Sequence, residues 1–128
     1  MRLGPGGIGY SDRMSVALDL ARPGIAVAAF NGESDQYDAD VFRRELALLD
    51  EPVPILIDLT RATFIDSTVA AALLEALRGA QAANVGLGIV LPGDTGQAVR
   101  RLFEVTGLDR LLPVFETHDA ALAAIRRA

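Results

Sequence analysis

The stretch Phe64-Ile65-Asp66-Ser67-Thr68 stands where an apolar segment gives way to residues rich in alanine and leucine. Residues 69–83 are strong helix formers, and their apolar side chains recur at helical spacing. Asp66 and Ser67 are both good N-cap residues, because a short side-chain oxygen accepts an unpaired N–H of the first turn. The stretch therefore predicts the end of a buried strand and the start of an amphipathic helix.

This boundary has two interpretations, and the residues alone leave both open. In the structural one, Asp66 and Ser67 serve only to cap the helix, which is the common role of such residues. In the functional one, one of them caps and the other lies at the surface, beside free backbone N–H groups and the positive end of the helix dipole. A phosphate added there would find a favourable field.

Apolar periodicity places further elements on both sides of the boundary. Residues 31–35 break the apolar pattern, and Gly107 is expected to end a helix in the left-handed conformation with Leu108 touching Phe103. In the helix over 69–83 the inward face is expected to hold Ala70, Leu73, Leu74 and Leu77. The expected elements in order are a strand hairpin over 15–20 and 25–30, a helix over 37–49, a strand over 53–59, the helix over 69–83, a strand over 85–91, a helix over 95–105, a strand over 112–115 and a helix from about Asp119.

This order predicts one α/β domain with a mixed sheet of about five strands and four helices, in which an N-terminal β-hairpin precedes β-α repeats. The 128 residues, 51% of them hydrophobic, suffice for a single core. We expect residues 1–12, rich in glycine, to be a flexible leader and residues 13–128 to form the domain. Because no apolar run reaches a membrane span of about 20 residues and no export signal is evident, we expect a soluble, cytoplasmic protein with no membrane insertion.

Composition argues against several classes of function. The chain has no cysteine and one histidine, His118, so the parts for thiol chemistry, histidine metal sites and catalytic triads are missing. We expect no enzyme activity, no metal and no cofactor, and we interpret His118 as a solvated or capping residue at a helix start. The net charge of −5 disfavours direct binding of nucleic acid.

Three segments together resemble the STAS domain of bacterial anti-sigma factor antagonists. Gly32-Glu33-Ser34-Asp35 is similar to that family's Gly-Glu-Leu-Asp, and Ile57-Asp58-Leu59 leads to Phe64-Ile65-Asp66-Ser67-Thr68 as in the family. Residues 101–108, Arg-Leu-Phe-Glu-Val-Thr-Gly-Leu, are similar to its Arg-Leu-Phe-x-x-x-Gly-Leu. The resemblance covers nearly everything from about residue 13 to the end.

The resemblance implies that Ser67 is phosphorylated by a partner anti-sigma factor that is itself a serine kinase. The unphosphorylated antagonist would sequester this kinase and free the sigma factor, and a PP2C-type phosphatase would restore the active form. Thr68 is the second choice as phosphate acceptor. The expected partner-binding residues are Asp35, Asp66, Ser67 and Thr68, with Asp58 as a further source of negative field.

Two further possibilities accompany this expectation. The family often has glycine where this chain has Val69, and a β-branched side chain there would impede the backbone of a partner. That departure motivates the alternative of a non-switching STAS scaffold, or of a soluble subunit in a lipid or solute transport assembly. An exposed edge of the N-terminal hairpin would also permit a homodimer.

Overall fold

The computed structural model describes residues 16–19, 24–91 and 97–127, so the expected leader over 1–12 lies outside the described residues. Its elements in chain order are β1 (Val16–Asp19), β2 (Ala26–Ser34), α1 (Gln36–Ala47), β3 (Ile55–Ile65), α2 (Ser67–Ala83), β4 (Leu87–Val90), α3 (Gln97–Thr106), α4 (Leu108–Leu111), β5 (Val114–Phe115) and α5 (His118–Arg127).

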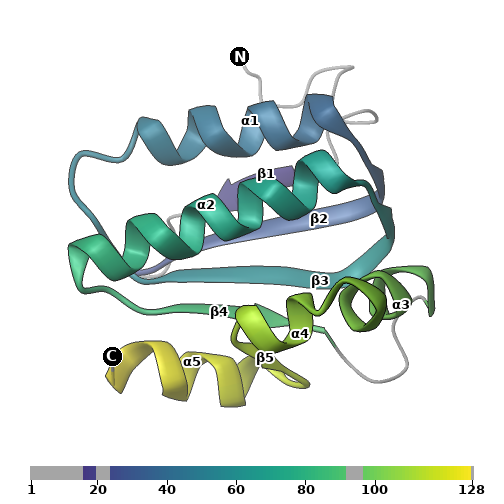
Figure 1. Cartoon of the computed structure of the whole chain (residues 1–128). Helices are drawn as coiled ribbons and strands as arrows, with labels where there is room; N and C mark the ends of the chain where they lie inside the picture. Colours follow the sequence, from purple (N-terminus) through teal and green to yellow (C-terminus); the bar gives the residue numbers. More distant parts are fainter. Residues whose placement is uncertain (1–15, 20–23, 92–96, 128) are drawn as a thin grey trace.

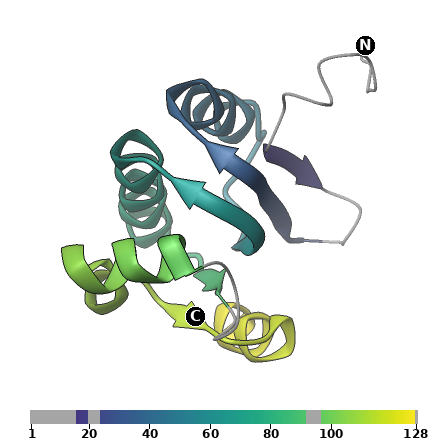
Figure 2. The same cartoon turned by 90° about the vertical axis from the view of Figure 1, so that its right-hand side faces the viewer.

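The described strands form one sheet in the order β1-β2-β3-β4-β5. β2 to β5 run parallel, and β1 pairs antiparallel with β2. Helices α1, α2 and α3 cover one face of this sheet, and α5 covers the other (Figures 1 and 2). The predicted α/β class is confirmed. The described residues form five helices rather than the expected four, because the chain re-enters a helical conformation in α4 directly after Gly107.

The two faces of the sheet hold two apolar clusters. On the face of α1, α2 and α3, Ile57 and Leu59 of the central strand β3 are fully buried. On the same face Phe30 of β2 contacts Phe42 of α1, with ring centroids 5.4 Å apart. The smaller cluster under α5 comprises Ile25, Leu56, Val90, Ala121 and Ile125. Burial on both faces explains why β3 and β4 begin as continuous apolar runs.

Two glycines allow α5 to approach the sheet closely. A Cβ on Gly86 would lie 2.5 Å from the backbone oxygen of Ile125, which is closer than atoms pack. A Cβ on Gly88 would lie 3.0 Å from the Ile125 side chain. The absence of side chains at these positions therefore sets the distance between α5 and the sheet.

β2 is longer than the sequence predicted. Residues 31–35 were expected to break the pattern, but Asn31 to Ser34 continue the strand and pair with β3. Gly32 has a positive φ of 69°, and the register shifts beside it. The polar residues of this stretch are typical of a turn. In the structure, Gly32 instead adopts a positive φ that lets an irregular strand stay paired with β3.

The inward stripe of α2 also differs from the prediction. Ala70, Leu74 and Leu77 are only partly buried, while the buried residues are Val69, Ala72, Leu73, Ala76 and Ala80. Three of these five buried residues are alanines, and only Val69 and Leu73 bring larger side chains. The predicted end of α3 is correct: Gly107 has a φ of 77°, and both Phe103 and Leu108 are buried in the same cluster.

Candidate functional site

The starts of α1 and α2 lie side by side at one edge of the sheet, to the right in Figure 1. Ser34 and Ile65 are register partners at the ends of β2 and β3. The Asp66 N–H donates to the Ser34 carbonyl oxygen at 3.2 Å, which holds the two strand ends together. Because each strand leads directly into a helix, the N-caps Asp35 and Asp66 occupy the same edge.

Asp66 is the residue that caps α2. Its backbone is extended, with φ −94° and ψ −179°. Its Oδ1 accepts the N–H of Thr68 at 3.0 Å and the N–H of Val69 at 3.1 Å. The helix thus obtains its cap without using Ser67.

Ser67 is the first residue of the 17-residue helix α2 and is exposed. In the described part of the chain, no hydrogen bond involves its hydroxyl group. Thr68 differs, because it is half-buried and its hydroxyl donates to Asp66 Oδ1. Of the two candidate acceptors, Ser67 is therefore the accessible one.

Asp35 caps α1 in the same way. Its Oδ1 accepts the N–H of Tyr37 at 3.0 Å, and the buried Asp38 accepts the N–H of Asp35 at 2.9 Å, which forms a capping box. Asp35 itself is exposed. The structure thus places Asp35, Asp66, Ser67 and Thr68 together at one edge of the sheet, and both aspartates also have a structural role.

Two exposed aromatic residues accompany these groups, and the sequence reasoning missed them. Phe64, next to last in β3, is 48% exposed, and Tyr37, in the first turn of α1, is 44% exposed. The sequence did hold a signal for Phe64. It is an apolar residue three positions before Ser67, at a point where the alternation of β3 is interrupted. Both rings add apolar surface at the elements that carry the site.

Val69 does not obstruct this edge. Its side chain is fully buried in the core on the α1–α3 face of the sheet. The expectation that a β-branched residue here would impede a partner was therefore wrong, because the third residue of α2 points inward.

Asp58 and His118 form a separate pair away from the site. His118 Nε2 lies 3.0 Å from Asp58 Oδ2, so His118 is not merely solvated, and Thr117 accepts the Ala120 N–H at the start of α5. Asp66 lies eight positions after Asp58 along an extended chain, roughly 26 Å away at about 3.3 Å per residue. Asp58 is therefore too far away to add to the field at Ser67.

Partial burial alone would raise the pKa of the Asp58 carboxyl. Hydrogen bonds from Thr60 and from His118 outweigh that effect, and the pKa of Asp58 is lowered overall. The Thr60 N–H donates to Asp58 Oδ1 at 2.8 Å. The charge of Asp58 thus has a structural use, in joining β3 to α5.

Among the described residues, no group of three or more acidic, histidine or cysteine side chains is arranged to hold a metal ion. Among the helices that the structure describes, none combines the length and the apolar character that a membrane crossing needs.

The parallel strands joined by helices define an α/β domain. At one edge of its sheet, the start of α2 presents an accessible serine, Ser67. A profile of the STAS domain matches residues 20–121 of this sequence. The chain therefore belongs to the STAS domain family. Curated protein sequences gave no match to it.

Solved structures with this fold include anti-sigma factor antagonists. One from Mycobacterium paratuberculosis is 28% identical, with a TM-score of 0.71, and the match covers 87% of this chain and 92% of that one. The antagonist SpoIIAA in its unphosphorylated form is 22% identical, with a TM-score of 0.69 and coverage of 88% and 97%. The Bacillus cell fate determinant SpoIIAA in the phosphorylated form is 21% identical, with a TM-score of 0.61 and coverage of 86% and 98%.

Proposed function

We propose that the protein is an anti-sigma factor antagonist of the cytoplasm, which binds and sequesters a serine-kinase anti-sigma factor while Ser67 is unphosphorylated. Phosphorylation of Ser67 by that kinase ends the binding, and a PP2C-type phosphatase restores it. The protein acts in this proposal by binding and not by catalysis. The observation that carries it is the exposed hydroxyl of Ser67 at the start of α2, beside a cap that Asp66 already supplies.

Physical chemistry supports a switch in binding rather than in folding. A phosphoserine carries about −1.5 to −2 charges at pH 7, and the N-terminal end of a helix dipole stabilises such an anion. The domain should therefore tolerate the modification. An anion about 4 Å from an acidic group of the partner costs about 4 kcal/mol at an effective dielectric of about 20, which corresponds to roughly a thousandfold in affinity.

The surface around Ser67 fits a protein partner. Phe64 and Tyr37 offer exposed rings, and Asp35 and Asp66 give the same edge of the sheet a negative charge. Aromatic side chains commonly carry much of the energy of protein interfaces, whereas charges set orientation and partner choice. Substitution of Phe64 by alanine should therefore weaken the complex even though it leaves Ser67 unchanged.

The decisive experiment combines phosphate mapping with binding. The protein is incubated with serine-kinase anti-sigma factors and ATP, and the modified residue is located by mass spectrometry. We expect phosphate on Ser67 in the native protein and in the Thr68→Ala variant, and none in the Ser67→Ala variant. Phosphate found only outside Ser67 and Thr68 would reject the proposal.

Binding is measured by calorimetry with Ser67→Asp, and Gln81→Glu serves as the matched control because it adds one charge at an exposed position farther along α2. Ser67→Asp should weaken the complex at least tenfold, while Gln81→Glu should leave it within about twofold. Unchanged affinity in Ser67→Asp would instead favour the non-switching scaffold or the subunit of a lipid or solute transport assembly.

A further inference from the structure

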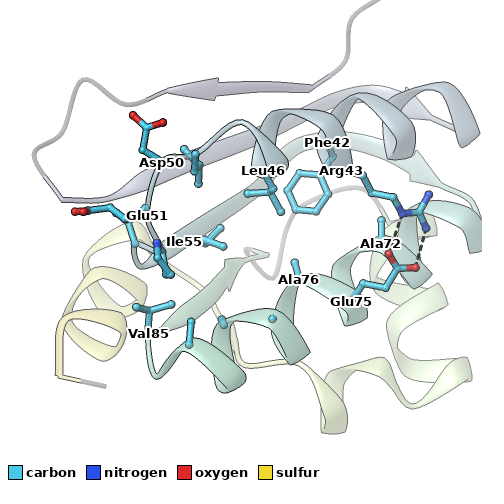
Figure 3. Close-up of a pocket in the computed structure, with 16 residues that line it drawn as sticks. Phe42, Arg43, Leu46, Asp50, Glu51, Ile55, Ala72, Glu75, Ala76 and Val85 are labelled. Atoms are coloured by element: carbon cyan, nitrogen blue, oxygen red, sulfur yellow. Dashed lines mark hydrogen bonds and ion pairs between the residues drawn. The ribbon is translucent and has the colours of Figure 1, made fainter.

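A groove lies between α1 and α2 and extends to the residues that join α1 to β3 (Figure 3). Its volume is about 490 Å³. Phe42 and Leu46 line it from α1, Ala72 and Ala76 from α2, and Ile55 from β3. The walls are therefore mostly apolar, and the volume falls within the range of about 300–1,000 Å³ that is usual for small-molecule sites.

The two ends of the groove differ in charge. At one end Arg43 and Glu75 form a two-point ion pair, with Nε–Oε1 and Nη2–Oε2 distances of 2.9 and 3.0 Å. This hydrogen-bonded pair ties α1 to α2 and neutralises both charges. Asp50 and Glu51 lie at the other end (Figure 3), are exposed, and form no hydrogen bond or ion pair within the described residues. The uncompensated charge at the groove is therefore negative.

Gly79 gives the second observation. It lies inside α2, where glycine is the poorest helix former apart from proline. A Cβ at this position would meet nothing within 4 Å, so packing within the domain does not require a glycine. Gly79 lines the groove, and the missing side chain keeps this part of it open.

We propose that the groove is a binding site for a small amphiphile with an apolar chain and a cationic head. The chain would lie between α1 and α2, against Leu46, Ala76 and Gly79. The head would lie beside Asp50 and Glu51, where a positive charge is favoured and a negative one is repelled. This site is independent of Ser67 and of the function proposed above.

The test uses hexyl-, octyl- and decyltrimethylammonium at concentrations below micelle formation, with decyl sulfate as the anionic comparison. Binding to the full chain is followed by NMR shifts and by calorimetry. The affinity should rise about fourfold for each methylene that the groove buries. Decyl sulfate should bind more weakly than decyltrimethylammonium, and the shifts should gather on the residues that line the groove.

Three variants locate the binding. Gly79→Leu fills the groove from an exposed position and should weaken decyltrimethylammonium binding at least tenfold, whereas the matched control Gly79→Ala adds one methyl group and should change it less than threefold. The Asp50→Asn/Glu51→Gln double variant should weaken the binding of the cationic probes about two- to fivefold. Binding of decanol, an uncharged probe with the same chain, should stay unchanged in this variant.

Three results would overturn the proposal: equal affinity for decyl sulfate, binding undiminished in the folded Gly79→Leu variant, or shifts spread over surfaces outside the groove. The same titration on Ser67→Ala protein separates this proposal from the switch. Unchanged amphiphile binding in that variant is expected whether or not Ser67 accepts a phosphate.

Discussion

His118 Nε2 and Asp58 Oδ2, 3.0 Å apart, connect the first residue of α5 to β3 across 60 positions of sequence. Ala121 and Ile125 of α5 make apolar contacts on this face of the sheet, and the Ile125 backbone passes close to Gly86. The pair is therefore a directional polar contact that fixes where the start of α5 sits over β3.

We predict that His118→Ala lowers the free energy of unfolding by about 0.5–1.5 kcal/mol, because it removes a hydrogen bond to a charged acceptor that is partly exposed. Urea denaturation measures the change. A double-mutant cycle with Asp58→Asn isolates the pair, and the two effects should be non-additive. Strict additivity would show that the contact contributes nothing to stability, and the exposed Arg110→Ala on α4 serves as the unrelated control.

The pH dependence of the unfolding free energy should reflect the ionisation of the Asp58 carboxyl group. Its pKa in the folded protein lies below the ordinary value of 3.8, so it contributes stability above pH 3.8 that is lost as the pH falls through the folded pKa. The native protein should therefore exceed Asp58→Asn in unfolding free energy at about pH 5.5, and this difference should shrink below about pH 4. A difference that stays constant down to about pH 2.5 would contradict the assignment, and Glu104→Gln, at an exposed position of α3, provides the control.

At the start of α2, Asp66 has the structural role of capping the helix, whereas Ser67 is proposed to have the functional one. Asp66→Ala should cost about 1 kcal/mol of unfolding free energy, because two backbone N–H groups lose their acceptor. Asp66→Asn should cost less, since asparagine caps about as well. Ser67→Ala should change stability by less than about 0.5 kcal/mol, because the exposed hydroxyl holds no partner in the described structure. If Ser67→Ala lost as much unfolding free energy as Asp66→Ala, the conclusion that Asp66 alone caps α2 would be wrong.

The elements that the sequence predicted well are those whose burial is simple. Ile55, Leu56 and Ile57 are covered on both faces of the sheet, so β3 begins as an uninterrupted apolar run. Beyond Leu59 the pattern fails, because Arg61 and Phe64 are exposed, and the strand continues to Ile65 through its backbone pairing with β2. Strand length there depends on hydrogen bonds that side-chain periodicity does not report.

The candidate site, like the fold, was predictable from the sequence only in part. The start of α2 was evident from Asp66 and Ser67, because capping is a local property of neighbouring residues. Which of the two caps depends on side-chain direction, and the structure was needed to decide it. The groove and the contact between Asp58 and His118 depend on segments far apart in the sequence, so no local pattern indicates them.

Gly86 and Gly79 offer a matched pair of substitutions with opposite expected signs. Gly86→Ala places a Cβ 2.5 Å from the backbone oxygen of Ile125, so α5 must move and the unfolding free energy should fall by about 1–3 kcal/mol. Gly79→Ala meets no atom and improves helix propensity, which should raise the unfolding free energy by about 0.5–1 kcal/mol. Urea denaturation of both variants under one set of conditions gives the comparison. A Gly86→Ala protein as stable as the native one would mean that α5 does not pack on β4 as closely as the structure shows.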